Sequence, residues 1–165
     1  MVEYVIVHCT ITPVRHQPSE GSEQLTQLLF GEVCEVLDRL PRWTKIRSTL
    51  DGQEGWVDFK MLTSVNSPYP TSHIQAVVAV PVAIATEMET GDELMLTLGT
   101  RLPNYAHGTF EVLGKQYLID PACVSQPIIS NSPLERPIGG TPSNTNNVCA
   151  IAQTLLNAPY LWGGK

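Results

Sequence analysis

Short alternating segments, divided by turn-forming residues, limit the fold of this chain more than any other feature of its sequence. Residues 33–37 follow a period-2 pattern, which is typical of a β-strand. A second such segment, residues 43–47, is followed by the turn sequence Asp51-Gly52, and a third begins at Gly55. No helical period is sustained between residues 4 and 65. We therefore predict a small all-β unit there.

After a proline-marked join at residues 67–70, the pattern of the first unit recurs. Four segments of the second unit parallel four of the first: Pro81-Val82-Ala83 with Pro13-Val14-Arg15, Leu98-Gly99-Thr100 with Phe30-Gly31-Glu32, Phe110-Glu111-Val112-Leu113 with Trp43-Thr44-Lys45-Ile46, and Gln116-Tyr117-Leu118 with Gly55-Trp56-Val57. The similarity is one of pattern more than of identity. Because an internal repeat decides the whole fold, we predict two tandem small barrels, one over residues 1–66 and one over residues 67–126.

The remaining residues change in character twice. Residues 127–146 are rich in Pro, Ser, Asn, Thr and Gly and keep no hydrophobic period, so we predict an extended linker. Within residues 147–165, apolar side chains from Val148 to Leu156 recur at helical spacing, and Asn157 and Pro159 end the helix. In a fragment this apolar stripe would lack its natural cover, so we expect an artificial dimer.

Composition excludes several classes of protein. With 42% hydrophobic and 16% charged residues, the chain is too apolar to be disordered throughout. No apolar run approaches the roughly 20 residues of a membrane span. A net charge of −6 without a Lys/Arg cluster argues against a general nucleic-acid or anionic-membrane binder. The four cysteines form no C-x-x-C pair, so we expect no metal and no cofactor.

The motifs of the first unit resemble those of a bacterial SH3 domain. They are Val14-Arg15-x-x-Pro18-Ser19, Ser22-Glu23-x-x-Thr26-Gln27, Leu29-Phe30-Gly31-Glu32, Trp43-x-Lys45-Ile46-Arg47 and Asp51-Gly52-x-x-Gly55-Trp56-Val57. The second unit is similar to a divergent copy of the same domain. The chain ends on Ala152-Gln153-x-Leu155-Leu156-x-x-Pro159-Tyr160-x-Trp162-Gly163-Gly164-Lys165, which resembles the opening of an NlpC-type cysteine peptidase domain. This order is similar to that of γ-D-glutamyl-L-diamino-acid endopeptidases such as dipeptidyl-peptidase VI.

The chain departs from that family at the catalytic site. The resemblance implies an Asp-Cys-Ser-Gly nucleophile segment shortly after Trp162-Gly163-Gly164 and His partners later still, and this sequence contains neither. A papain-like mechanism needs a thiolate, a His and a group that orients the His. Cys149 has no base in its sequence setting, so we assign no catalytic residue. We expect a fragment or truncated product: a mainly β chain with one helix from an incomplete papain-like α+β domain.

The candidate substrate-binding residues are Glu23, Tyr160 and Trp162, which the resemblance implies, and Trp56, which lies beside the Gly55 turn. Glu23 matches the acidic side chain that reads the free amine of the L-Ala end of a stem peptide, and a carboxylate suits an ammonium group. The alternative is a solvated loop carboxylate. Tyr160 and Trp162 match aromatics on the substrate side, or they only pack a loop. Gln53 replaces the aromatic residue that often follows the Asp-Gly turn in the family.

Four residues of the first unit, two of them tryptophans, have simpler expectations. Trp43 is expected to pack the barrel, whereas Trp56 could instead line the substrate cleft. Arg15 is expected to anchor the first loop. Cys34, within an alternating segment, is expected to be a small buried thiol.

These features favour a non-catalytic N-terminal portion of a bacterial cell-wall peptide cysteine peptidase. Its SH3 units would gate and recognise murein stem peptides with a free L-Ala amine, and its partners would be such peptides and the remaining peptidase domain. The alternative is a stand-alone SH3 module that binds cell wall or a protein, which an exposed aromatic patch around Trp56 and Tyr117 would favour. The third hypothesis is a spacer that only positions a catalytic partner. The N-terminus shows no targeting signal, so both a cytoplasmic and a cell-envelope location stay open.

Overall fold

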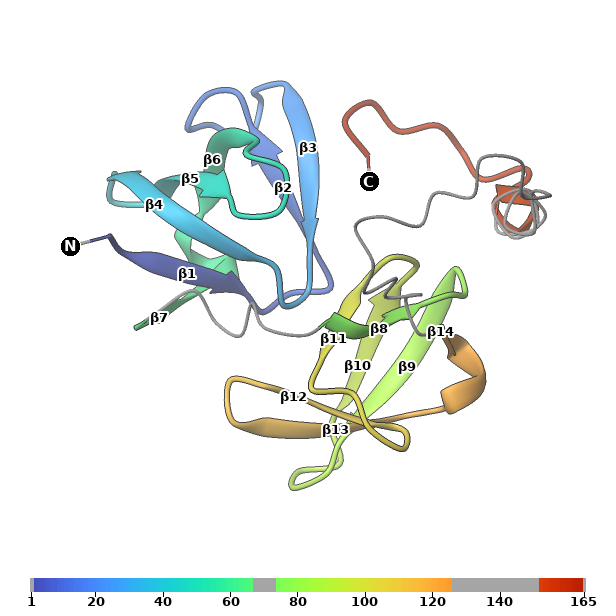
Figure 1. The fold of residues 1–165 in the computed structure, drawn as a ribbon. Coiled ribbons are helices and arrows are strands. Elements are labelled where there is room, and N and C mark those ends of the chain that lie inside the picture. Colours follow the sequence, from blue (N-terminus) through green and yellow to red (C-terminus); the bar gives the residue numbers. More distant parts are fainter. Residues whose placement is uncertain (1, 67–73, 126–151, 165) are drawn as a thin grey trace, which may run out of the picture.

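The computed structural model describes residues 2–66, 74–125 and 152–164 (Figure 1). Within these ranges the chain is mainly β, as predicted, with 14 strands in three antiparallel sheets. The helix predicted near the C-terminus is described only from residue 152, and it continues to residue 154. The predicted linker, residues 127–146, and Cys149 lie outside the described residues. No described helix has the length and hydrophobicity that crossing a membrane requires.

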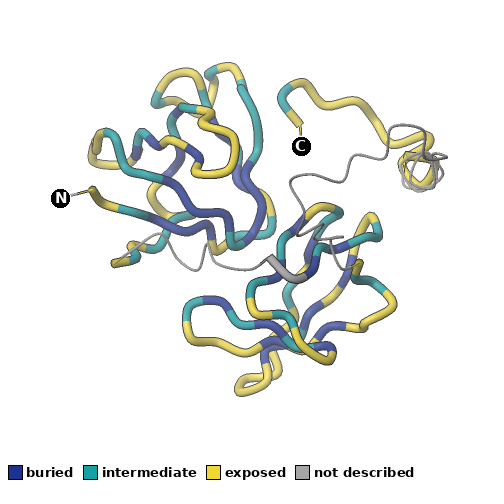
Figure 2. Tube along the Cα trace, in the orientation of Figure 1, coloured by how far each residue is buried: buried dark blue, intermediate teal, exposed yellow. Residues whose placement is uncertain are grey.

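The first unit is one seven-stranded sheet with the strand order β3-β2-β6-β5-β4-β1-β7. Apolar side chains fill its interior, and the tube in Figure 2 is dark blue at the residues that are buried. The predicted segments 33–37, 43–47 and 55–57 lie in β4, β5 and β6. The elements are β1 (Tyr4–Val7), β2 (Ile11–Arg15), β3 (Gln24–Leu29), β4 (Val33–Arg39), β5 (Trp43–Ser48), β6 (Glu54–Asp58), the 3₁₀ turn η1 (Phe59–Met61) and β7 (Leu62–Val65).

The second unit has two sheets with the strand orders β10-β9-β13-β12 and β11-β8-β14. Its seven strands follow the order of the first unit, with one break where the first unit joins β5 to β4. The elements are β8 (Ile74–Val78), β9 (Val82–Glu87), β10 (Glu93–Thr97), β11 (Arg101–Pro103), β12 (Thr109–Val112), β13 (Lys115–Ile119), the 3₁₀ turn η2 (Pro121–Cys123) and β14 (Val124–Ser125).

Two local devices recur at matching places in the two units. Gly31 and Gly99 both have positive φ (79° and 86°), where glycine is favoured, and their N–H groups donate to Val7 O and Val78 O at 2.9 Å. Asp58 and Asp120 both cap a 3₁₀ turn with the side-chain carboxylate. These matches fix which residues of the two units correspond. The predicted pairing of Gly31 with Gly99 has the correct register.

The other predicted pairings are shifted along the strands. Ile11 pairs with Leu29 in the first unit and Val82 pairs with Thr97 in the second, so Val82 corresponds to Ile11 and not to Val14. Counting back from the aspartate caps, Tyr117 corresponds to Gly55 and not to Trp56. A one-residue shift in a strand moves a side chain to the opposite face. Tyr117 therefore points inward, whereas Trp56 does not.

One apolar core joins the two units. Its buried members include Ile6, Phe30 and Val33 from the first unit and residues from every long strand of the second. The Tyr117 ring stacks on Phe110 at a centroid distance of 5.1 Å, and Phe30 meets Tyr117 edge-on at 5.9 Å. Because Tyr117 is only 8% exposed, an exposed aromatic patch of Trp56 with Tyr117 does not form. The stand-alone module therefore lacks the observation that would favour it.

We predict that Phe30→Ala destabilises both units together. The substitution removes the aromatic side chain that the first unit contributes to the shared core, and large-to-small changes of this kind cost about 3–5 kcal/mol. Urea unfolding followed by fluorescence and circular dichroism should show one transition at lower urea concentration. Ile84→Ala, at a side chain that is 47% exposed, is the control and should change the free energy of unfolding by less than about 0.5 kcal/mol. Two separate transitions, of which only one shifts, would contradict a shared core.

Candidate functional site

The C-terminal segment, residues 152–164, reaches the start of β3 in the first unit (Figure 1). The indole Nε1 of Trp162 donates a hydrogen bond of 3.0 Å to Glu23 Oε1, across 139 positions of sequence. The side-chain Nε2 of the next residue, Gln24, donates to the carbonyl oxygen of Trp162 at 3.2 Å. The structure thus brings together two of the four predicted site residues, Glu23 and Trp162.

Gly163 sets how closely the two segments approach. Its φ is +67°, and a Cβ at this position would lie 2.4 Å from Gln24 O and 3.1 Å from the Leu25 carbonyl carbon. A side chain there would collide with backbone atoms, which cannot move aside as a flexible side chain can. The Gly164 N–H donates to Leu161 O at 2.9 Å and closes the turn around Trp162 and Gly163. The segment is therefore seated backbone against backbone.

The loop before β3 holds Glu23 at a defined place. Arg15 Nη1 donates to Ser22 O at 3.1 Å, and this contact confirms the predicted anchoring role of Arg15. The His16 N–H donates to Glu23 O at 2.9 Å, and the Gln17 N–H donates to Ser22 Oγ at 2.8 Å. The backbone of Glu23 is thus fixed on both sides, while its side chain stays exposed.

Trp56 lies in the same cross-strand row as the C-terminal contact. Arg15 pairs with Gln24 on β3 and with Trp56 on β6, so the three side chains project from one face of the sheet. Gly55 allows β6 to pass this close, because a Cβ there would lie 2.4 Å from Val14 Cγ1 and 2.9 Å from Arg15 O. Trp56 itself is half-buried, which leaves part of the ring on this face.

Tyr160 and Trp162 are not covered by the described residues. Tyr160 is 84% exposed and Trp162 is 64% exposed. Both interpretations of these aromatics, as substrate-side rings or as rings that pack a loop, stay predictions. Cys34 is fully buried, so the prediction of a buried thiol is confirmed. Trp43 is only 8% exposed, but it lies on the face of the sheet that carries Lys45 and Trp56, opposite the face of the buried Ile46.

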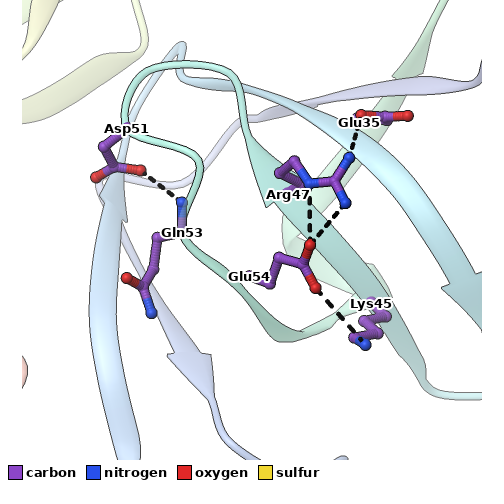
Figure 3. Close-up of polar contacts among 6 residues, drawn as sticks. All are labelled: Glu35, Lys45, Arg47, Asp51, Gln53 and Glu54. Atoms are coloured by element: carbon purple, nitrogen blue, oxygen red, sulfur yellow. Dashed lines mark hydrogen bonds and ion pairs between the residues drawn. The ribbon is translucent and has the colours of Figure 1, made fainter.

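An ion-pair network lies on the same sheet near the β5–β6 turn (Figure 3). Arg47 Nε and Nη2 donate to Glu54 Oε1 at 2.9 and 2.7 Å, and Arg47 Nη1 donates to Glu35 Oε2 at 3.2 Å. The hydrogen bonds between Arg47 and Glu54 lower the pKa of the Glu54 carboxyl group and raise the pKa of the Arg47 guanidinium. These partly exposed pairs are weakened by salt and contribute little stability. They do position the strands that carry the turn.

Gln53 lies at that turn, where the resembled family often has an aromatic residue. Its N–H donates to Asp51 Oδ1 at 3.1 Å, and Gly52 adopts a φ of +76°. The Gln53 side chain is exposed and points away from the Arg47 network (Figure 3). The predicted Asp51-Gly52 turn is thus confirmed, and its tip offers an amide rather than an aromatic ring.

Asp58 is the most buried member of a second polar cluster. Arg42 Nε donates to Asp58 Oδ2 at 3.0 Å, and the Arg42 guanidinium lies over the Trp43 ring at 5.9 Å. Burial by itself would raise the pKa of Asp58, but the Lys60 N–H and Arg42 outweigh it, so the pKa lies below its usual value.

The described residues hold no arrangement for metal or thiol chemistry. They contain no group of three or more His, Cys, Asp or Glu side chains that could bind a metal ion. Cys9 and Cys123 are free thiols, and burial raises the pKa of Cys9, which disfavours its thiolate.

Sequence reasoning missed Gln24 and the conformational role of Gly163. Gln24 follows the predicted Glu23 directly, but nothing local shows that its side chain meets residue 162. The Gly163-Gly164 pair was the available signal for a positive φ, because glycine adopts that region without the steric cost that other residues incur.

Comparison with known proteins identifies the first unit. Residues 12–63 match the bacterial SH3 domain family, so the chain contains one such domain. The whole chain is similar in fold to an NlpC/P60 family protein from Bacillus cereus, with a TM-score of 0.73 and 17% identity over 98% of this chain and 66% of that one. The chain therefore spans about two thirds of the length of that protein. No curated protein matches the sequence.

Two further solved structures show a more distant likeness. NlpC2 from Trichomonas vaginalis matches with a TM-score of 0.34 and 9% identity over 76% of this chain and 48% of that one. NlpC1 from the same organism matches with a TM-score of 0.34 and 11% identity over 75% of this chain and 45% of that one. The assignment of a second SH3 domain and of a peptidase opening stays a prediction.

We predict that Asp58→Asn flattens the acid side of the stability profile. Because the folded-state pKa of Asp58 is lowered, its carboxylate stabilises the fold above the unfolded-state pKa of about 3.9. That contribution is lost as the pH falls through the lower folded-state pKa. Asp58→Asn should cost about 1 kcal/mol at pH 7 through the weakened cap and pair. Urea unfolding from pH 7 to pH 2.5 measures both effects. An unchanged difference between variant and wild type across this range would contradict the assignment.

Proposed function

We propose that this chain is the non-catalytic N-terminal portion of a bacterial cell-wall peptide cysteine peptidase. Its SH3 units would gate the substrate cleft and recognise murein stem peptides that carry a free L-Ala amine. The observation that supports this most is the hydrogen bond between Trp162 and Glu23. It joins the segment that resembles the opening of a peptidase to the residue that resembles the amine reader.

Glu23 has the chemistry that recognition of an amine requires. Its side chain is exposed, and the ion pairs among the described residues do not include it. A carboxylate accepts short, charge-assisted hydrogen bonds from an ammonium group, and these are about twice as strong as neutral ones. An N-acylated peptide presents no such charge. Glu23 would therefore select peptides whose first residue is free.

The surrounding aromatics would form the walls of the cleft. Trp56 shares a face with Arg15 and Gln24, and Trp162 approaches the same strand from the C-terminal segment. Flat apolar rings pack well against a methyl side chain such as that of alanine. Tyr160 lies two positions before Trp162, and its phenol group is exposed. An exposed phenol can donate a hydrogen bond to a substrate carboxylate. The nucleophile and its His partner would come from the part of the enzyme beyond these residues.

The fold comparison and the SH3 match are consistent with this role. A bacterial SH3 domain within a chain that folds like an NlpC/P60 protein suggests a bacterial, cell-wall-related module. A stand-alone module that binds cell wall or a protein partner is the alternative. An exposed aromatic patch of Trp56 and Tyr117 would have favoured this alternative, but Tyr117 is buried.

We predict that Glu23→Gln removes selectivity for a free amine. By calorimetric titration the wild-type chain should bind a peptide that begins L-Ala-γ-D-Glu more tightly than its N-acetylated form. The variant should lose about tenfold or more for the free-amine peptide, since a hydrogen bond to a charged group contributes about 1.5–3 kcal/mol. Affinity for the acetylated peptide should stay the same.

Glu20→Gln is the matched control for this experiment. Glu20 carries the same charge and lies in the same loop between β2 and β3, but it pairs with Arg42. Its substitution should leave both affinities unchanged. If wild type binds free and acetylated peptides equally, or if both Gln variants behave alike, recognition of the amine by Glu23 is refuted. A Glu23→Ala substitution in a complete enzyme that leaves selectivity unchanged would favour a plain spacer.

A further inference from the structure

We propose that Trp162 is a positioning residue that orients the Glu23 carboxylate for its ligand. The indole N–H holds Oε1 of Glu23 and leaves Oε2 open to a ligand cation. This inference rests on the proposed function for the identity of that cation, a primary ammonium group. It assigns to Trp162 a polar role that is separate from forming an aromatic wall.

The pairing of Glu23 differs from that of four other glutamates in the first unit. Each of these four pairs with an arginine: Glu3 with Arg39, Glu20 with Arg42, and Glu35 and Glu54 with Arg47. Glu23 instead accepts from a neutral indole N–H. An arginine would neutralise the carboxylate, whereas an indole orients it and leaves its negative charge in place. Glu23 is thus held without being neutralised.

The position of the indole is itself constrained by three contacts. The indole N–H of Trp162 donates to Glu23 Oε1 at 3.0 Å, and the backbone carbonyl of Trp162 accepts from Gln24 Nε2 at 3.2 Å. The next residue, Gly163, sits directly on the backbone of Gln24. Trp162 is therefore tied at its side chain, at its carbonyl and through its neighbour. A donor anchored in this way can restrict the side chain that it contacts.

Restriction of Glu23 would favour binding. An exposed glutamate rotates about three side-chain bonds, and a ligand that needs one conformation must bear the entropic cost of fixing them. The contact with Trp162 removes part of that cost before the ligand arrives. The opposite possibility is that the indole occupies the place of the ligand and competes with it. The two differ in sign, because removing the N–H weakens binding in the first case and tightens it in the second.

The contact can be tested first without ligand. In ¹⁵N-labelled protein, the three tryptophans give three indole ¹H–¹⁵N signals, and Trp162→Phe identifies that of Trp162. Glu23→Gln should shift this signal and leave that of the buried Trp43 in place, whereas Glu20→Gln should shift neither. A Trp162 signal that is the same in wild type and Glu23→Gln would overturn the proposal.

Ligand titration then tests the positioning role. Trp162→Phe keeps an aromatic ring and removes the N–H. Because Trp162 is 64% exposed, a loss of binding in this variant is not explained by unfolding. It should weaken binding of the L-Ala-γ-D-Glu peptide about tenfold and leave the N-acetylated peptide unaffected. Leu161→Ala, in the same turn, should have no effect on either.

The outcomes separate this inference from the proposed function. Unchanged or tighter binding of the free-amine peptide by Trp162→Phe overturns the positioning role while the proposed function stands. Equal loss for both peptides also overturns it, since the indole would then serve only as a wall. Failure of the wild type to bind either peptide, with the Trp162 signal still sensitive to Glu23→Gln, rejects the proposed function, and the positioning role falls with it.

Discussion

The packing of Tyr117 against Phe110, face to face, and against Phe30, edge-on, is the contact on which the arrangement of the two units depends. Phe30 belongs to the first unit, and its edge meets a ring of the second. Ile6 and Val33 extend the same core. Small barrels have little interior of their own, and a core shared between two of them buries more apolar surface than either could alone. We therefore expect the two units to unfold together.

The outer face of the first sheet is built on a different physical basis. There, cross-strand charges such as Arg47 with Glu35 and Glu54 are partly exposed and contribute mainly to strand placement. The row that contains Gln24, Arg15 and Trp56 lies on this same sheet. The candidate site thus occupies a polar surface whose geometry is set by the apolar interior beneath it. Such a surface can change its recognition chemistry at little cost to the fold.

Much of the fold could be predicted because its signals are local. The Asp51-Gly52 turn, the strands around residues 33–37 and 43–47, and the burial of Cys34 all follow from patterns within a few residues. The register of the repeat could not be predicted in this way. Strand patterns of period 2 match themselves at several offsets, and only the hydrogen bonds of Gly31 and Gly99 and the aspartate caps fixed which offset was correct.

In the candidate site, too, some features follow from local sequence patterns and others depend on long-range contacts. Arg15 as a loop anchor follows from its neighbours, and Glu23 as a site residue follows from a family motif. The bond between Glu23 and Trp162 has no local signal, because it spans 139 positions. Gln24 and Gly163 entered the site only through that long-range approach. Contacts between distant segments depend on the whole fold, so the sequence pattern of neither segment reveals them.

The distance in sequence between Glu23 and Trp162 also has a consequence for biosynthesis. Chains are made from the N-terminus at about 5–20 residues per second, so Glu23 leaves the ribosome well before Trp162 does. During that interval the first unit can form its sheet, but its carboxylate has no indole to hold it. The contact between Glu23 and Trp162 can form only after residues 152–164 have been made and reach β3. A nascent chain that has not reached these residues could thus hold a folded first sheet and still lack this contact.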